Sequence, residues 1–477
     1  MNGTDAIALL PLILLAGTSV VVMLAIAVSR NHGLTLWLTL AGLAAAFASI
    51  WIAAAPLAPR QITSLLVIDN YSLFYFGLLI AADFAVAILA YEYMVKHDIH
   101  PQELYILLLI ATVGGGVLVA SSHFASFFLG LEILSVSLYA MVSYLPSRRQ
   151  SLEAGIKYLV LAAASAAFLL FGMALIYADL GTMEFNRMAH PVSPTEGNDL
   201  LVVCGLALII TGIGFKLAVA PFHLWTPDVY EGAPAPVTAF IATASKGAMF
   251  ALLLRYFYRS GAATDHRILL VLTIIAIASM LAGNLLALLQ SNVKRILAYS
   301  SIAHMGYLLV ALLASGELAV EAVTFYLVAY FITTLGAFGV VSVLSHTHRE
   351  ADRIEDYQAL FWRRPALASV FTVMLLSLAG IPVTAGFIGK FYIVATGAAS
   401  EIWALIIILV VSSVVGLFYY LRIIAAMYGP AEQQTAVTTA SISAPTGAVL
   451  GVLTGLLLWF GIYPEPLLRI IRVVLPT

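Results

Sequence analysis

The chain has 477 residues, of which 62% are hydrophobic and only 10% are charged, and its formal net charge is −2. Soluble domains carry about 25% charged residues, so this composition excludes a soluble enzyme of this size. The near-neutral charge provides no basic field for nucleic acid. The single cysteine, Cys204, excludes an intrachain disulfide and an iron–sulfur cluster held by four thiolates of this chain. The chain is therefore expected to lie in a lipid bilayer.

Repeated apolar stretches of about 20 residues match the length that an α-helix needs to cross the bilayer core. We predict an all-α membrane protein with about 14 transmembrane helices, one of which is interrupted. The spans lie near residues 6–29, 34–55, 71–94, 102–120, 123–145, 152–178, 199–220, 234–257, 267–289, 295–314, 318–345, 365–397, 402–428 and 443–463. No lysine or arginine precedes the first apolar run, so a cleaved signal peptide is not expected.

The charges of the connecting loops indicate an orientation. If residues 30–33 face the cytoplasm, eleven loop lysines and arginines lie on that side and seven on the opposite side. With an even number of spans, this predicts that both termini are periplasmic in a bacterial inner membrane. The basic stretch 255–267 opposes this orientation, because it falls on the side with fewer positive charges.

Two spans contain helix-breaking residues. Pro221 interrupts the seventh span, and Pro382 interrupts the twelfth in a stretch that also holds three glycines. Proline breaks the helical ladder and exposes backbone groups that only a polar cavity tolerates in a membrane, and paired broken helices are typical of transport sites built from inverted repeats. The alternative is a pair of ordinary proline kinks.

The spacing of the two breaks, five spans apart, predicts two inverted five-helix repeats formed by spans 4–8 and 9–13. The predicted domains are an N-terminal three-helix segment at 1–100, repeats at 101–258 and 259–428, and a C-terminal helix at 429–477.

Four lysines and two acids lie at depth within the predicted spans: Lys157, Lys216, Lys246, Lys390, Asp83 and Glu132. Such groups cost a few kcal/mol at mid-bilayer, so they face a wet interior or a partner. A buried lysine is able to exchange a proton near neutral pH, whereas arginine stays charged, so four lysines without an arginine favour proton transfer. Alternatively, each lysine only pairs or snorkels to hold helices together. Snorkelling explains Lys157 almost as well, and Asp83 is interpreted as an inter-helix or inter-subunit contact.

The positions of Glu132 and Lys216 within their spans predict an ion pair. Glu132 lies near the centre of the fifth span and Lys216 deep in the seventh, so an ion pair between them is geometrically feasible. Loosening such a pair would lower the proton affinity of the amine. Lys246 lies near the middle of the eighth span, and Lys390 follows the break of the twelfth.

Three segments carry a family resemblance: residues 153–158, 215–247 and 290–307. They resemble the antiporter-like, proton-translocating subunits of bacterial NADH:quinone oxidoreductase (respiratory complex I), and the subunit N family in particular. The matching segments cover about residues 100–425. A lysine at 390 differs from the glutamate typical of subunit M, and no long lateral helix of the subunit L type follows the last span.

The resemblance implies a proton half-channel along a polar central axis. It implies that Glu132 and Lys216 form an ion pair, that Lys246 is the central relay and that Lys390 lies toward the exit. The secondary polar members would be Lys157, His223 and His304. It further implies that this chain holds no cofactor, since the flavin, the iron–sulfur clusters and the quinone site would belong to neighbouring subunits. The expected partners are subunit M and the small membrane-arm subunits beside it.

Two related functions and one unrelated function remain open at this point. The related ones are a subunit of a multi-subunit sodium/proton antiporter, and a membrane subunit of a hydrogenase or of an oxidoreductase with another electron donor. The unrelated one is a passive scaffold whose buried charges only hold neighbouring subunits together. Genes for flavin and iron–sulfur subunits beside the gene would favour complex I.

Overall fold

The computed structural model describes residues 3–54, 60–97, 101–146, 148–188, 199–260, 263, 265–314, 316–346, 350–430 and 442–474. Within these residues, 13 helices are long and apolar enough to cross a membrane. Two shorter apolar helices, α17 (Pro365–Ala379) and α18 (Ala385–Ala399), supply the interrupted span. The 14 predicted spans are therefore confirmed.

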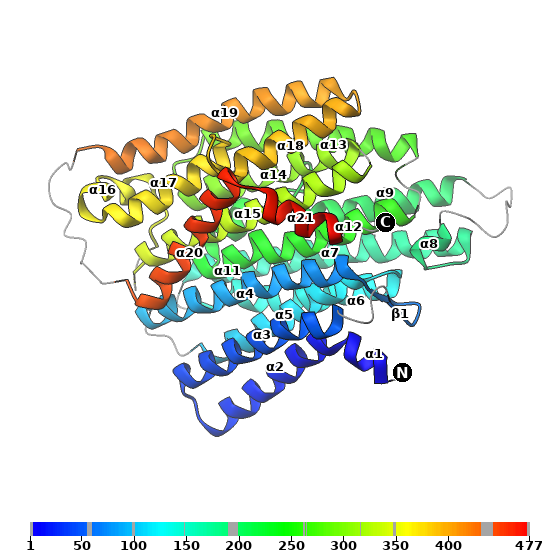
Figure 1. The fold of residues 1–477 in the computed structure, drawn as a ribbon, viewed down its shortest axis with the longest axis horizontal. Helices are drawn as coiled ribbons and strands as arrows, with labels where there is room; N and C mark the ends of the chain where they lie inside the picture. The colour runs from blue at the N-terminus through cyan, green and yellow to red at the C-terminus, as the bar shows by residue number, and fades with distance from the viewer. Residues whose placement is uncertain are drawn as a thin grey trace.

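The remaining spanning helices form the bundle of Figure 1. They are α2 (Leu10–Val28), α3 (His32–Ala54), α4 (Asn70–Lys96), α5 (Gln102–Ala120), α6 (Phe124–Val142), α7 (Arg149–Leu180), α9 (Asp199–Leu217), α11 (Ala235–Phe240) continued by the π-helical turn η1 (Ile241–Ser245) and α12 (Lys246–Arg259), α13 (His266–Leu288), α14 (Val293–Ala314), α15 (Glu317–Leu344), α19 (Trp403–Tyr428) and α20 (Ala444–Ile462).

Short elements connect or flank these spans. They are α1 (Gly3–Ala8), α8 (Phe185–Met188), α10 (Trp225–Gly232), the 3₁₀ helix η3 (Ile354–Tyr357), α16 (Leu360–Arg363), α21 (Glu465–Val474), and the antiparallel strands β1 (Arg60–Ile62) and β2 (Leu66–Ile68). In the strand pair, Gln61 lies opposite Val67. Neither this hairpin nor α21 is expected from the hydropathy pattern, because both are too short to cross a membrane.

Helix packing repeats in two five-helix units. α5 packs on α6 as α13 packs on α14, and α7 packs on α9 as α15 packs on α17 and α18. α12 then returns to α5, as α19 returns to α13. Because each unit has an odd number of spans, the second copy is inverted in the membrane. The predicted repeats are thus supported by the packing, while the domain limits at 101–258 and 259–428 stay predictions.

Both predicted interruptions are full breaks of the helix. α9 ends at Leu217 and α10 begins at Trp225, with Pro221 between them. α17 ends at Ala379 and is capped by Gly380, whose φ of +83° is the left-handed conformation that favours glycine. After Pro382, α18 restarts at a cap in which Thr384 Oγ1 accepts a hydrogen bond from the Phe387 amide. Ordinary proline kinks are therefore not what the chain forms.

Burial separates an enclosed centre from an outer ring. The continuous helix 235–259 and α14 and α15 are almost wholly buried, whereas α2, α7 and α20 turn most of their surface outward. α20 and α21 lie across α15 and α4, as Figure 1 shows. A side chain on α12, α14 or α15 is consequently shielded from lipid by the helices around it.

Candidate functional site

Three of the predicted lysines are enclosed at the centre of the bundle. Lys216, Lys246 and Lys390 are 4%, 1% and 9% exposed. An ammonium group that leaves water without a partner is costly, and more so within a membrane. The atoms that each amine contacts therefore define what this site is able to do.

Lys216 lies in the last turn of α9, directly before the first break. Its ammonium donates hydrogen bonds to Ser135 Oγ at 2.9 Å and to Tyr158 OH at 3.2 Å. The expected direct ion pair with Glu132 is not formed in this structure. Ser135 follows Glu132 by one turn of α6, so both face the same side of that helix, and the Glu132 carboxylate remains near enough to interact electrostatically with Lys216.

Glu132 lies closer to the outer surface of the bundle than Lys216 does. It is only partly buried, and its neighbours one turn away, Leu129 and Val136, are 57% and 60% exposed. A carboxylate at the middle of a span is not expected to face lipid. This face of α6 therefore fits a protein surface better than it fits lipid.

Side-chain contacts stabilise the first break. The Trp225 indole donates to the Phe215 carbonyl at 2.9 Å, and the Ala220 amide donates to Ser279 Oγ at 2.9 Å. The Trp225 ring also stacks on Tyr158 with 4.8 Å between centroids, which holds that tyrosine beside Lys216. His223, a predicted secondary site residue, is buried within the break.

Lys246 directly follows the π-helical turn η1. Such turns occur mostly as local insertions in α-helices and frequently at functional sites. The Lys246 ammonium donates to Ser301 Oγ at 2.7 Å and lies 5.5 Å from the centroid of the Tyr230 ring. Tyr330 OH donates to the same Ser301 oxygen at 2.7 Å. The central amine is thus held by the Ser301 hydroxyl and lies over the ring of Tyr230, while Tyr330 contacts it only through Ser301.

One face of α14 carries the polar groups between Lys246 and the second break. Ser301, His304 and Tyr307 recur every three residues, which places them on one side of the helix. His304 Nδ1 hydrogen-bonds Tyr326 OH at 2.8 Å, and its Nε2 lies 3.4 Å from Tyr420 OH. His304, predicted as a secondary site residue, is therefore positioned between the two lysines along this helix.

Lys390 is held by the second break itself. Its ammonium donates to the carbonyl oxygens of Leu378 at 2.9 Å and Ala379 at 3.0 Å, and to Ser413 Oγ at 2.8 Å. The carbonyls at a helix C-terminus lack intrahelical partners and carry partial negative charge. The broken helix therefore supplies the counter-charge for this lysine, whose amine also lies 5.1 Å from the Tyr307 ring centroid.

These contacts assemble a row of titratable groups across the centre of the membrane domain. The row consists of a carboxylate, three amines and an imidazole. Each amine donates to a serine hydroxyl, and the imidazole hydrogen-bonds tyrosine hydroxyls, which are groups that both donate and accept hydrogen bonds. Each of these amines, the carboxylate and the imidazole is a group that is able to bind and release a proton. The hydroxyl members are not evident from sequence alone, although the spacing of Ser301, His304 and Tyr307 is a usable signal.

Two of the buried charges predicted from the sequence lie outside this row. The Lys157 side chain is 44% exposed and pairs with Glu153 at 2.8 Å and Asp228 at 2.9 Å, which favours the alternative that it reaches the membrane surface. Asp83 is fully buried, and its Oδ2 accepts a hydrogen bond from Thr112 Oγ1 at 2.8 Å. The inter-helix contact expected for Asp83 is thus confirmed, between α4 and α5.

A second buried ion cluster was not predicted from the sequence, because its two cations lie in or directly after connecting loops. Glu350 accepts from Lys294 Nζ at 2.5 Å and lies 2.8 Å from Arg148 Nη1, and Tyr93 OH donates to it. Burial alone would raise the pKa of the Glu350 carboxyl, but the two cations outweigh it and hold that pKa below its ordinary value. Lys294 also donates to the Ala233 carbonyl at 2.6 Å, where α10 ends.

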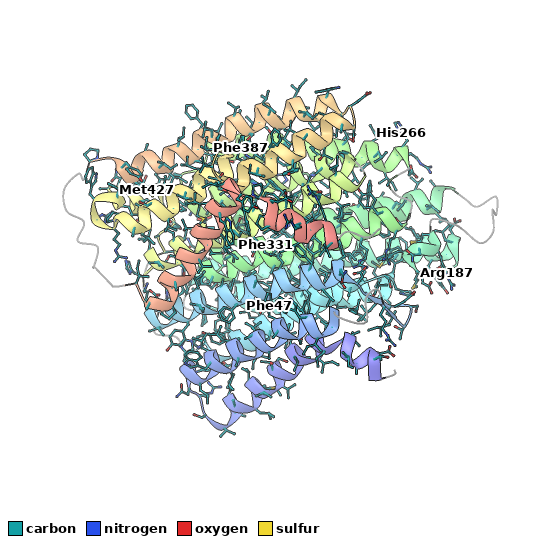
Figure 2. All side chains as sticks on the ribbon, viewed as in Figure 1. Phe47, Arg187, His266, Phe331, Phe387 and Met427 are labelled. Atoms are coloured by element: carbon teal, nitrogen blue, oxygen red, sulfur yellow. The ribbon has the colours of Figure 1, made fainter. Side chains whose placement is uncertain are left out.

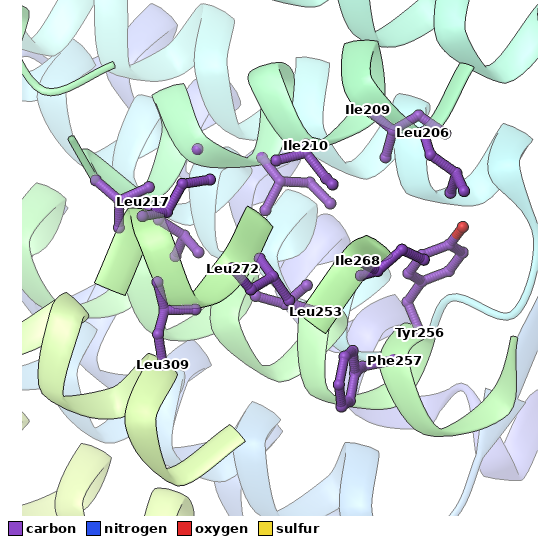
Figure 3. Close-up of a pocket in the computed structure, with 14 residues that line it drawn as sticks. Leu206, Ile209, Ile210, Leu217, Leu253, Tyr256, Phe257, Ile268, Leu272 and Leu309 are labelled. Carbon is purple, nitrogen blue, oxygen red and sulfur yellow. The ribbon is translucent and has the colours of Figure 1, made fainter. Parts of the chain in front are cut away.

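One small pocket inside the bundle is lined by aliphatic and aromatic side chains. The small pocket of about 40 Å³ in Figure 3 lies between α9, α12 and α13, and its lining is aliphatic apart from two aromatic rings. Across the ranges that the structure describes, no group of three or more histidine, cysteine, aspartate or glutamate side chains is arranged to hold a metal ion.

Comparison with known proteins identifies the family of this chain. Residues 121–416 match the family described as NADH:quinone oxidoreductase/Mrp antiporter, TM. A chain of respiratory complex I from Thermus thermophilus with bound aureothin has a TM-score of 0.83 and 34% identity, over 96% of this chain and 98% of that chain. A chain of an archaeal membrane-bound sulfane sulfur reductase has a TM-score of 0.82 and 25% identity, over 98% and 96%.

A chain of the Mrp complex from Dietzia sp. shares the fold alone, with a TM-score of 0.85 at 20% identity over 99% and 97% of the two chains. The fold and the family match together show an antiporter-like, multi-pass membrane subunit.

Relatives of nearly full length narrow this class. Proteins named NADH-quinone oxidoreductase subunit N are 49% identical in Ectopseudomonas mendocina, 54% in Nitrosospira multiformis and 48% in Methylococcus capsulatus. Each match covers 98% of this chain and 94–96% of the relative. The chain belongs to the family of NADH-quinone oxidoreductase subunit N.

Proposed function

We propose that the chain translocates protons as a membrane-arm subunit of an NADH:quinone oxidoreductase. The observation that carries this proposal is the row from Glu132 through Lys216, Lys246 and His304 to Lys390, in which each amine donates to a hydroxyl. Lysine is suited to this task because its ammonium is able to release a proton when its surroundings change, whereas arginine is not. The row crosses both inverted repeats, so a proton moved along it passes between their two halves.

The breaks give the row two places where the environment of an amine is able to change. Lys390 depends on the two carbonyls at the end of α17, and the loop around Pro221 directly follows Lys216. A movement of either loop alters the partners of the amine without unfolding a whole span. Driving force for such a movement would come from quinone reduction in other subunits, with flavin, iron–sulfur clusters and quinone bound there and no cofactor in this chain.

The proposal extends to partners and membrane. We infer that the partly exposed Glu132 face contacts another membrane-arm subunit, with subunit M and the small subunits beside it as the candidates. A bacterial inner membrane with both termini periplasmic is consistent with the loop charges. The polar row equally suits a subunit of a sodium/proton antiporter, and identity to the Mrp neighbour is only 20%.

The test removes one amine and keeps its volume. We expect Lys216→Met to leave the complex assembled but to reduce NADH-driven proton pumping sharply in reconstituted vesicles, because the row loses a proton carrier. Lys96→Met is the matched control, since Lys96 lies at the membrane edge and pairs with Glu92 at 2.7 Å. Wild-type pumping by assembled Lys216→Met complex would refute the proposal and favour a passive scaffold.

Two measurements distinguish an oxidoreductase subunit from a sodium/proton antiporter subunit. Subunits that copurify in mild detergent would include flavin and iron–sulfur proteins for an oxidoreductase. Pumping that depends on NADH and persists without sodium supports the proposed function. Sodium-dependent exchange without any electron donor would assign the chain to an antiporter instead.

A further inference from the structure

Asp83 is a buried carboxyl group that lies outside the polar row. It lies at the middle of α4 and is 0% exposed. Thr112 Oγ1 of α5 is 2.8 Å from its Oδ2, and its Oδ1 has no hydrogen-bond partner among the described residues. A carboxylate buried without a cation is costly, and such a group neutralises by keeping its proton. The surroundings of Asp83 therefore decide which form it takes.

The ion pairs along α4 lie at its two ends. At the start, Arg255 of α12 pairs with Asp69 at 2.8 Å, and near the end Lys96 pairs with Glu92 at 2.7 Å. In the part of the chain that the structure describes, no charged side chain interacts with Asp83 between them. An ionised Asp83 would thus have no counter-ion, unlike the carboxylates at either end of the same helix.

The Thr112 hydroxyl distinguishes the two forms of Asp83. Its oxygen lies within hydrogen-bond distance of two acceptors, Asp83 Oδ2 at 2.8 Å and the Leu108 carbonyl oxygen at 3.0 Å. Threonine has one hydroxyl hydrogen and therefore donates to only one of them, and a bond to the carbonyl four residues earlier is usual within a helix. A protonated Asp83 supplies the second hydrogen, so that both contacts are hydrogen bonds. An ionised Asp83 leaves one of them without a hydrogen.

The contacts of α4 with α12 fix how the two helices are aligned. Tyr71 OH donates to the Ala251 carbonyl at 2.8 Å. Farther along α4, a Cβ atom at Gly115 of α5 would lie 3.0 Å from Leu79 Cδ1 and 3.5 Å from Ala248 Cβ. Residue numbers therefore rise along α4 as they fall along α12, and the two helices are antiparallel.

The same alignment places the Asp83–Thr112 pair beside the segment that carries the central amine. One turn beyond the contact at Gly115, Asp83 and Thr112 come level with Ser245, the last residue of η1 and the residue before Lys246. Both α4 and α5 contact η1. The Lys246 ammonium itself donates to a neutral hydroxyl. A negative charge at Asp83 would favour the protonated form of this lysine, whereas a neutral acid does not.

Side chains also fill the space on another side of this segment. A Cβ atom at Gly247, the residue after Lys246, would lie 2.4 Å from Phe331 Cζ. Figure 2 labels Phe331 among the side chains at the centre of the bundle. Charges interact more strongly in such close-packed, low-dielectric surroundings than they do in water. The charge of Asp83 therefore matters for Lys246 even without direct contact between the two side chains.

We propose that Asp83 is a positioning residue that acts as a neutral carboxylic acid. Its own proton bonds α4 to Thr112 of α5, and its neutral form keeps negative charge away from Lys246. The first statement depends only on burial and hydrogen bonding. The second rests on the proposed function, in which Lys246 releases a proton. Asparagine is the closest substitute, because its amide is neutral and donates hydrogen bonds.

An infrared measurement reads the protonation state of Asp83 directly. At about pH 8, ordinary aspartate and glutamate side chains are ionised, so the C=O stretch of a protonated carboxyl group comes only from acids that the protein holds neutral. We expect the resting wild-type complex to show a band of this kind that Asp83→Asn lacks. Glu355→Gln, which changes an exposed carboxylate, is the matched control and should leave this region of the spectrum unchanged.

Thr112→Val supplies a second spectral test and carries the test if Asp83→Asn does not assemble. Valine resembles threonine in shape but accepts no hydrogen bond, so the carboxyl band should remain and move to higher frequency. Equal spectra for wild type and Asp83→Asn would overturn the proposal, because Asp83 would then be ionised. An unshifted band in Thr112→Val would overturn it as well. The spectra are recorded without turnover, so they remain readable if the proposed function fails.

Pumping at different pH values tests the link to Lys246. Asp83→Asn should pump within about twofold of wild type wherever the wild-type carboxyl band is present, because both side chains are then neutral donors. At any alkaline pH at which that band is lost, the wild type should pump more slowly than Asp83→Asn, which is unable to ionise. A loss of pumping by Asp83→Asn near neutral pH, or equal pumping after the band has disappeared, would overturn this link.

Discussion

Replacing Glu350 by glutamine removes one negative charge from a buried cluster while keeping its shape. Glu350 is 2% exposed, and its two cations, Lys294 and Arg148, would be left without their counter-ion. Breaking a buried ion pair by removing one partner costs about 3–5 kcal/mol. The cluster joins the N-terminal helices through Tyr93, the first repeat through Arg148 and the second through Lys294. The loss is therefore expected to loosen all three parts together.

The size of the effect on melting temperature follows from the chain length. Unfolding entropy is about 2.1 cal/mol/K per residue, which amounts to about 1 kcal/mol/K for 477 residues. A loss of about 3–5 kcal/mol then lowers Tm by about 3–5 °C. The measurement is thermal unfolding of the purified complex in detergent, followed by tryptophan fluorescence. Glu355→Gln, on the exposed side of the same connection, is the control and should leave Tm unchanged.

The pH dependence of this difference has a defined sign. The pKa of the folded Glu350 carboxyl is lowered, so its contribution to stability is fully present above the unfolded value of about 4.3. It is lost as the pH falls through the folded pKa. The Tm difference between wild type and Glu350→Gln should hold constant from pH 8 to 5 and shrink below about pH 4.

Two outcomes would refute the reasoning about Glu350. The first is an equal Tm for Glu350→Gln and Glu355→Gln. The second concerns Lys294→Met, which should cost much less stability in the Glu350→Gln background than in the wild type, because the pair is already broken. Additive effects of the two substitutions would mean that the residues do not act as a pair.

Three further perturbations test other contacts. Gly247→Ala should cost about 1–3 kcal/mol of stability, because its methyl group collides with Phe331; recovery of Tm in the double variant with Phe331→Leu checks the cause, and no recovery would contradict it. Ser135→Ala removes a charge-assisted hydrogen bond of about 1.5–3 kcal/mol and should slow proton pumping at least roughly tenfold. Ser137→Ala, on the same helix, is the control and should leave the pumping rate unchanged. Equal pumping rates for the two variants would exclude the Ser135 hydroxyl from the row. Lys157→Gln loses only exposed ion pairs of about 0–1 kcal/mol and should keep pumping within about twofold, whereas a loss as deep as that of Lys216→Met would assign Lys157 to the row.

The spans and the breaks were predictable because a bilayer imposes their length and their composition. Lysines at 216, 246 and 390 were identifiable as buried by the same reasoning, since each lies in the interior of an apolar run. Depth along a helix, however, does not tell which way a side chain points. Lys157 starts inside a span and still reaches the surface.

The contacts of the site were less predictable, because they join residues far apart in the chain. Ser135, Ser301 and Ser413 look like ordinary serines in membrane helices, and only the tertiary packing brings them to the amines. Lys294 resembles a loop cation of the kind that sets orientation, yet it is fully buried against Glu350. Charge and hydropathy patterns carry no information about such pairings.

Two structural features require glycine at position 380. Its left-handed φ of +83° ends α17, and a Cβ atom there would lie 2.8 Å from Lys390 Cδ. The backbone reversal and the space for the aliphatic stem of the lysine are therefore the same feature. Because the carbonyls that meet the ammonium are fixed by this one reversal, a twist of the chain there changes their distance from the charge. A movement of the backbone at Gly380 would therefore also change the electrostatic environment of the Lys390 ammonium.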